Sequence, residues 1–197
     1  VGKREVGWNM DSVKRLARDC SRSQYTAGIL ASGGCLDTIS CILTGFAVLW
    51  GTEIDPHQRA MFTDITSSIA LGDTYGVDWS AQVRVDYISS GQPCDDYSSS
   101  GSCQGEDGKT GWQFVRQCDI ILDRLPRAFK LEIVPNAERL HGGRALRKVI
   151  RKLSSEYHVV RKRIRVHEFG DISNRERLFI VGVHKSCGPK ASSFTFP

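Results

Sequence analysis

Short apolar runs that alternate with amphipathic stretches constrain the fold of this chain more than any other feature. Strands that alternate with helices form a parallel sheet, because each helix carries the chain back to the start of the next strand. The sequence therefore predicts an α/β fold with a doubly wound, mostly parallel sheet. Strands are expected at 26–31, 47–51, 86–90 and 128–134, and helices at 35–44, 56–62, 111–125 and 145–153.

The two ends of the chain depart from this alternation. An amphipathic stretch at 10–20, with Asp11 or Ser12 as its expected N-cap, predicts a helix outside the main sheet. Two extended runs, 157–166 and 178–183, come last without a helix between them, so we expect an antiparallel, hairpin-like edge. The resulting division is a basic extension, a main domain and a tail, at 1–25, 26–185 and 186–197.

Composition places the chain among ordinary globular proteins. Its 197 residues are 40% hydrophobic and 25% charged, which suffices for one domain with a substantial core. The sequence has no apolar run of membrane-spanning length and opens with no signal peptide, so we expect no membrane association. The seven cysteines show neither CxxC nor Cys/His zinc spacing. This pattern predicts reduced thiols, a cytoplasmic or nuclear location and no metal site.

Basic residues are concentrated in one stretch near the carboxyl end, which we call the basic band. Ten of them lie between positions 139 and 165, against Glu138 and Glu156. Such a band suits a polyanion, through attraction to phosphates and release of counterions. It also suits a solvated helix face next to an exposed edge strand, and the charge pattern leaves both interpretations open. The ten residues are Arg139, Arg144, Arg147, Lys148, Arg151, Lys152, Arg161, Lys162, Arg163 and Arg165.

A glycine turn and a carboxylate follow the first two expected strands. The turn Ser32-Gly33-Gly34 precedes a helix, where the backbone can approach a ligand and the helix N-terminus favours polar or anionic groups. Glu53 follows the second strand, and an acidic residue there commonly accepts hydrogen bonds from ribose hydroxyls. Each feature alone also fits a tight turn or a solvated strand end. Together they favour an adenosine-containing cofactor.

A cysteine in a proline turn ends the third expected strand. The turn is Gly91-Gln92-Pro93-Cys94, and a Ser/Gly-rich loop with no periodicity follows it up to Gly111. A thiol at the mouth of a strand is a candidate nucleophile, although a buried structural role is commoner for cysteine.

In this order, the motifs resemble those of the cytosine-5 DNA methyltransferase family. The resemblance runs from about Ala27 to Val183 and implies the Rossmann-like fold of class I S-adenosylmethionine-dependent methyltransferases. It implies S-adenosylmethionine as cofactor and DNA as substrate, with RNA as an alternative because one branch of the family methylates transfer RNA. The matching segments are 28–36, 50–56 and 72–73 for the cofactor motifs, 91–98 for the catalytic cysteine, 131–136 for the catalytic glutamate and 169–182 for the arginine motif.

The resemblance also implies a role for each site residue. Cys94 would add to carbon 6 of a flipped-out cytosine, and Glu132 would hydrogen-bond or protonate ring nitrogen 3. Arg175 and Arg177 would hold the carbonyl oxygen of the base. Without the resemblance, Glu132 could instead pair with Lys130, and the arginines could be surface charges. The implied cofactor residues are Leu30, Ser32, Gly33, Gly34, Glu53 at the ribose, Ile54 against the adenine, Asp73 at the adenine amino group, and Pro93.

Several residues differ from the family pattern. Leu30 replaces a phenylalanine, Ser32 a glycine and Ser173 a glutamine. Asp95 replaces another glutamine, and its charge beside Cys94 would oppose thiolate formation. Ile133 replaces an asparagine whose hydrogen bonds order the catalytic turn.

The family's target-recognition region and final motif have no counterpart in these residues. The residues therefore resemble the catalytic half of such an enzyme: a fragment, a split subunit whose recognition region a second chain supplies, or a decayed copy. The alternative is a non-catalytic homologue that binds cofactor or nucleic acid and regulates a partner.

Overall fold

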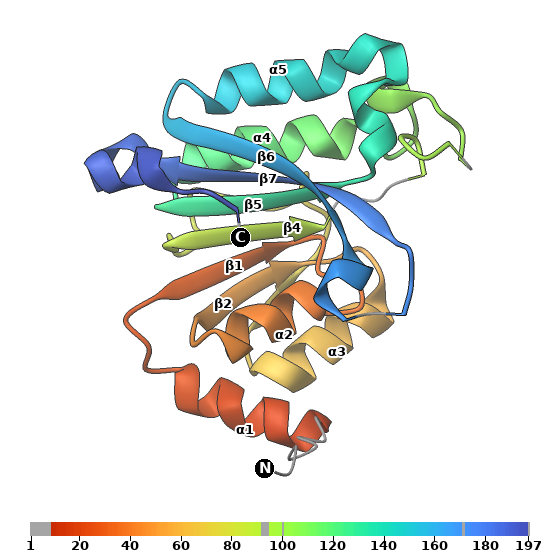
Figure 1. Cartoon of the computed structure of the whole chain (residues 1–197). Coiled ribbons are helices and arrows are strands. Elements are labelled where there is room, and N and C mark those ends of the chain that lie inside the picture. Colours follow the sequence, from red (N-terminus) through yellow and green to blue (C-terminus); the bar gives the residue numbers. More distant parts are fainter. Residues whose placement is uncertain (1–8, 92–94, 100, 171, 197) are drawn as a thin grey trace. The chain divides into compact units, whose positions relative to one another are not determined.

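The computed structural model describes residues 9–91, 95–99, 101–170 and 172–196 (Figure 1). The chain divides into two compact units, 1–77 and 78–197. Strands and helices alternate in both units, as the sequence predicts.

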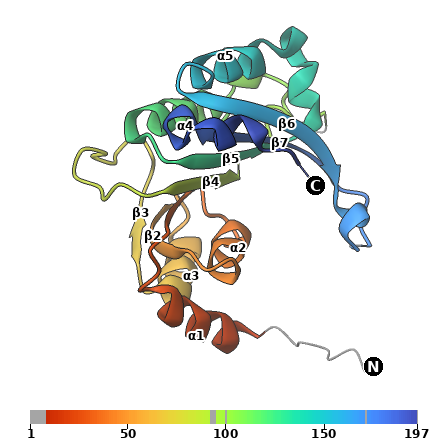
Figure 2. The ribbon, with the colours of Figure 1, turned by 60° about the vertical axis from the view of Figure 1, so that its left-hand side comes forward.

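The first unit contains a parallel sheet with the strand order β3-β2-β1. β1 (Thr26–Leu30) and β2 (Ala47–Thr52) match the predicted runs, whereas β3 (Ile69–Leu71) is too short to be predicted from its pattern. Two helices connect these strands in succession and lie on the same side of the sheet (Figure 2). They are α2 (Leu36–Leu43) and α3 (Pro56–Thr66).

Side-chain caps define where two helices of this unit begin. At α1 (Met10–Cys20), the side chain of Asn9 accepts a hydrogen bond from the Ser12 N–H at 2.8 Å. The prediction that Asp11 or Ser12 would cap this helix is therefore wrong, because the free N–H groups of the first turn point back to position 9. Asp55 caps α3 in the same way through the Gln58 N–H, and Pro56 occupies its first turn.

The helix α1 packs against α2 and α3. Lys14 pairs with Asp64 of α3 at 2.6 Å, and the Cys20 thiol donates to the carbonyl oxygen of Ile42. A glycine admits the largest side chain of the core, because a Cβ atom at Gly28 would lie only 2.2 Å from the indole of Trp50. The fully buried core of this unit includes Ile29, Leu30, Ile42, Trp50, Phe62 and Ile65.

The second unit contains a mixed sheet with the strand order β4-β5-β7-β6. β4 (Tyr87–Gly91) and β5 (Ala128–Ile133) are parallel, whereas β7 (Glu176–His184) runs antiparallel to both of its neighbours. The predicted antiparallel pair is confirmed, and it is β6 (Tyr157–Arg165) that forms the edge of this sheet.

Two helices pack against each other beside this sheet (Figure 1). They are α4 (Trp112–Arg124) and α5 (Arg144–Leu153). The Phe129 ring meets the Tyr157 ring edge-on, with centroids 4.9 Å apart, and Gly182 leaves room for that phenylalanine. The buried residues of this unit include Phe114, Cys118, Ile121, Phe129, Leu131, Tyr157 and Ile180.

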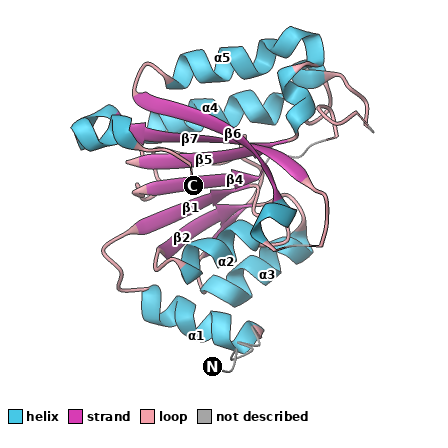
Figure 3. Ribbon diagram, in the orientation of Figure 1, coloured by secondary structure: helices cyan, strands magenta, loops and turns pink. Residues whose placement is uncertain are grey.

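Between β4 and α4, the described residues 95–99 and 101–111 form mostly turns and irregular backbone (Figure 3). Within it, only Gly105–Asp107 form a short 3-10 helix, η1, among the described residues. None of the helices in the described part of the chain is long and apolar enough to cross a membrane.

Candidate active site

One candidate site, for a cofactor, lies where the parallel strands of the first unit end. The Ser32–Gly34 turn follows β1, Glu53 follows β2 and Asp73 follows β3. The carboxyl ends of parallel strands meet at one edge of a sheet, which is where open α/β sheets bind ligands. The sheet registry supports this placement, because the Glu53 N–H donates to the carbonyl oxygen of Leu71 at 3.1 Å.

The Glu53 carboxylate joins two of these strand ends. One oxygen accepts the Gly33 N–H at 2.7 Å, and the other accepts the N–H groups of Ile54 and Asp55 at 2.9 and 3.0 Å. A carboxylate offers roughly four acceptor positions, so about one is left for an outside hydroxyl group. Arg59 holds the same turn by donating to the carbonyl oxygens of Glu53 and Ile54.

The other residues assigned to the cofactor differ in exposure. Ile54 is 61% exposed, as an apolar surface for a flat ring would be, whereas Leu30 is completely buried in the core. Ser32 is 5% exposed, and its buried hydroxyl group has no partner among the described residues. The exposed Asp73 accepts a hydrogen bond from the Tyr75 N–H at 3.1 Å. At Gly34, a Cβ atom would meet nothing within 4 Å, so the backbone of the turn borders open space.

The second unit contains another candidate site, a cluster of one glutamate and two arginines. Glu132 Oε1 lies 3.1 Å from Arg175 Nη2 and 3.2 Å from Arg177 Nε. The Glu132 side chain is 19% exposed, and those of Arg175 and Arg177 are 49% and 23% exposed. Lys130, the other partner considered for Glu132, has its ammonium group 5.7 Å from the ring centre of Phe179.

The sheet explains why these three side chains meet. Glu132 is near the end of β5, and its partner in the parallel register of β4 is Gly91. Because β7 is antiparallel to β5, the beginning of β7 lies beside the end of β5, with Leu178 opposite Ile133. The antiparallel reversal thus brings Arg177 and the preceding Arg175 to the glutamate.

The predicted nucleophile, Cys94, and the predicted cofactor residue Pro93 lie outside the described residues. Chain connectivity places Cys94 three residues after Gly91, the residue paired with Glu132 in the sheet register. Two other cysteines are poor nucleophiles, because burial raises the pKa of the Cys35 thiol and raises that of Cys118 to about 12.

Asp96, which was not predicted from the sequence, organises the loop after Cys94. Asp96 is 3% exposed, and its carboxylate accepts hydrogen bonds from the Ser102 hydroxyl, the Thr110 N–H and hydroxyl, and the Gly111 N–H. These bonds, led by that from Ser102, lower the pKa of Asp96 from 3.8 to about 2. Two adjacent aspartates in a loop without periodicity give no sequence signal for such a role.

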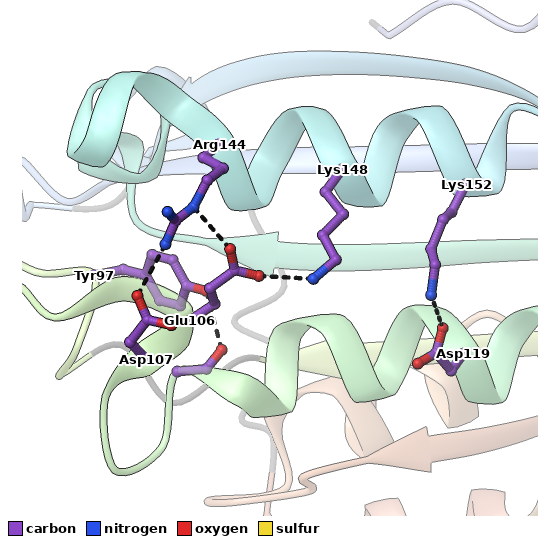
Figure 4. A network of polar contacts seen from close by, with 8 residues as sticks. Tyr97, Glu106, Asp107, Asp119, Arg144, Lys148 and Lys152 are labelled. Carbon is purple, nitrogen blue, oxygen red and sulfur yellow. Dashed lines mark hydrogen bonds and ion pairs between the residues drawn. The ribbon is translucent and has the colours of Figure 1, made fainter.

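Ion pairs fasten the second half of this loop to α5 (Figure 4). Glu106 pairs with Arg144 at 2.9 Å and with Lys148 at 3.0 Å, and Asp107 pairs with Arg144 at 2.8 Å. Further along the same helix, Lys152 pairs with Asp119 of α4 at 2.5 Å.

Acidic side chains nearby therefore neutralise much of the positive charge of the basic band. On β6, Arg161 and Arg163 pair with Glu138, and Arg165 pairs with Glu176. These pairs favour the interpretation as a salt-bridged helix face and edge strand over that of a polyanion surface. In the part of the chain that the structure describes, no group of three or more His, Cys, Asp or Glu residues is arranged to hold a metal ion.

Comparison with known proteins identifies relatives along most of the chain. The family model of the C-5 cytosine-specific DNA methylase matches residues 32–197. The type II methyltransferase M.HpaII of Haemophilus parainfluenzae is 31% identical over 156 residues, which are 77% of this chain and 42% of that protein. The chain thus spans less than half the length of this curated relative.

Solved structures share the fold. A DNA modification methyltransferase encoded within an E. coli prophage superimposes with a TM-score of 0.67 at 21% identity, over 83% of this chain and 48% of that one. The Entamoeba histolytica methyltransferase EhMeth gives a TM-score of 0.64 at 12% identity, over 82% and 53% of the two chains. These similarities confirm the predicted Rossmann-like fold class.

Proposed function

Because the chain belongs to the C-5 cytosine-specific DNA methylase family, we propose that it is the catalytic part of an enzyme that methylates carbon 5 of cytosine in DNA. The observation that carries this proposal is the Glu132–Arg175–Arg177 cluster at the end of β5. A carboxyl group held by two guanidinium groups can meet the ring nitrogen of a pyrimidine while the arginines meet its carbonyl oxygen.

The strand ends of the first unit have the chemistry needed to hold S-adenosylmethionine. The Glu53 carboxylate keeps about one acceptor position for a ribose hydroxyl, and the exposed Ile54 offers an apolar face for the adenine ring. Asp73 can accept from the adenine amino group. Leu30, Ser32, Gly33, Gly34 and Pro93 complete the proposed cofactor set. When bound, this cofactor supplies the methyl group.

The residues of the chain would prepare cytosine to accept that methyl group. The Cys94 thiolate forms a bond to carbon 6, and the electron pair displaced from the 5,6 double bond makes carbon 5 nucleophilic. Glu132 stabilises the charge that develops at ring nitrogen 3 by hydrogen bonding or proton donation. After carbon 5 is methylated, loss of its proton returns the electron pair to the ring and expels the Cys94 thiolate.

The base must leave its stack for this chemistry, so we propose that cytosine is flipped out of the duplex. Sequence readout would require a recognition part outside these 197 residues, on the same polypeptide or on a second chain. This part of the proposal is supported by the extent of the match to M.HpaII, of which the chain covers 42%.

Covalent trapping tests the proposal. The protein is mixed with S-adenosylmethionine and with DNA that contains 5-fluorocytosine, which blocks the final elimination. We expect a covalent protein–DNA adduct for the wild type and none for Cys94→Ala. For Glu132→Gln, we expect the rate of adduct formation to fall by about 10²–10⁴-fold, the usual contribution of a general acid.

Three further measurements distinguish the proposed function from its alternatives. Binding of S-adenosylmethionine without an adduct would refute the enzymatic proposal for this chain and favour a non-catalytic homologue. Trapping on fluorocytosine-containing RNA but not on DNA would refute the DNA substrate. An adduct that persists in Cys94→Ala would refute Cys94 as the nucleophile.

A further inference from the structure

The loop that follows Cys94 is folded around the Asp96 carboxylate. Its donors come from Ser102 in the middle of the loop and, 14 and 15 residues after Asp96, from Thr110 and Gly111 at its end. The main chain adds a further closure, because the Gly105 N–H donates to the carbonyl oxygen of Asp96 at 2.8 Å. The buried carboxylate of Asp96 therefore holds distant parts of the loop together.

This closed loop is tied to the strand that carries Glu132. Asn136 follows the end of β5, and its side-chain amide donates to the carbonyl oxygen of Tyr97 at 2.9 Å. The Tyr97 side chain is 1% exposed, and its hydroxyl donates to the carbonyl oxygen of Gly111 at 3.0 Å. Asn136, four residues after Glu132, thus links the strand that carries Glu132 to the loop.

Asn136 also stands near a position where this chain departs from its family. Ile133 replaces the family's asparagine, and its side chain is completely buried, so it offers the catalytic turn no hydrogen bond. Asn136 supplies an amide to a carbonyl oxygen of the same loop three residues later.

We propose that Asp96 and Asn136 are positioning residues, which fix the chain segment that presents the Cys94 thiol relative to Glu132. This inference rests on the proposed function. Asp96 is two residues after Cys94 in the sequence, so the anchored loop begins directly after the proposed nucleophile. Neither residue touches the reacting atoms in this assignment, because both act through the backbone.

The test compares Asp96→Asn and Asn136→Ala with matched controls in the full chain. Asp123→Asn removes an equivalent charge at a side chain that is 64% exposed, and Gln104→Ala removes an exposed amide from the same loop. Three quantities are measured: S-adenosylmethionine affinity, the rate of adduct formation with fluorocytosine DNA per cofactor-binding site, and hydrogen exchange of the amides in 95–111.

We expect the two test variants to form the adduct at least tenfold more slowly than wild type, with cofactor affinity within twofold. Exchange should speed up in 95–111 and stay unchanged in the first unit. Dividing the rate of adduct formation by the number of cofactor-binding sites removes the contribution of unfolded protein. A residue with a merely structural role would therefore leave this normalised rate unchanged. The controls should match the wild type in all three measurements.

An adduct rate within threefold of wild type in both test variants would overturn the inference, as would unchanged exchange in 95–111. A wild-type chain that binds cofactor but forms no adduct would overturn the proposed function instead. In that case, the exchange measurements alone would still decide whether Asp96 and Asn136 anchor the loop.

Discussion

Replacing Asp96 by asparagine should destabilise the protein in a way that depends on pH. The pKa of Asp96 falls from 3.8 to about 2 in the folded protein, chiefly through the Ser102 hydroxyl and the Thr110 N–H. At about 1.4 kcal/mol per pKa unit, this difference in pKa sets an upper limit of roughly 2.5 kcal/mol on the unfolding free energy lost in Asp96→Asn. Solvent screening around the partly exposed donors reduces the expected effect to about 1–2 kcal/mol.

The sign follows from which state holds the proton. The pKa is lower in the folded state, so the stabilisation is complete above the unfolded pKa of 3.8 and is lost as pH falls toward about 2. The difference in unfolding free energy between wild type and Asp96→Asn should therefore be constant from pH 7 to 5. At pH 3 it should have decreased by about half.

Urea unfolding at pH 7, 5 and 3, followed by circular dichroism and by exchange of the amides in 95–111, measures this difference. Asp123→Asn is the control, and its difference from wild type should stay within about 0.5 kcal/mol at every pH, as is usual for an exposed residue. A difference for Asp96→Asn that is equal at pH 3 and pH 7, or larger at pH 3, would refute the reasoning.

Two further predictions test the packing of the second unit and the proposed cofactor site at the strand ends of the first unit. Gly182→Ala places a Cβ atom 2.2 Å from the Phe129 ring, so it should lower the unfolding free energy by about 1–3 kcal/mol, as overpacking does. The open position Gly72 is its control in urea unfolding, and equal losses for the two alanine variants would contradict the prediction. Glu53→Gln removes the charge that binds the Gly33 N–H and should weaken S-adenosylmethionine binding at least tenfold. A calorimetric dissociation constant within twofold of wild type would exclude that role.

The strand ends could be predicted from sequence because each carries a local signal. Glu53 and Glu132 both stand at the end of an apolar run, and such runs reveal themselves by length and bounding residues. The contact between Glu132 and Arg175 needed the family resemblance, since it joins residues 43 positions apart through a register that periodicity does not encode.

Other features had no signal that a sequence pattern could detect. The donors to Asp96 come from irregular backbone, where neither a helical nor a strand period exists. Gly28 opens the segment that resembles the first cofactor motif, yet the structure uses this glycine to make room for the Trp50 indole. The distinction depends on a neighbouring strand that the local sequence does not show.

The antiparallel placement of β7 also bears on how the protein folds. In the first unit, the bond between Gly33 and Glu53 closes a separation of 20 residues, whereas Glu132 meets Arg175 across 43. Longer loops cost more entropy to close, and contacts distant in sequence slow folding. The Glu132–arginine cluster should therefore assemble after the strand ends of the first unit, so that a newly synthesised chain forms its proposed cofactor site before its proposed catalytic site.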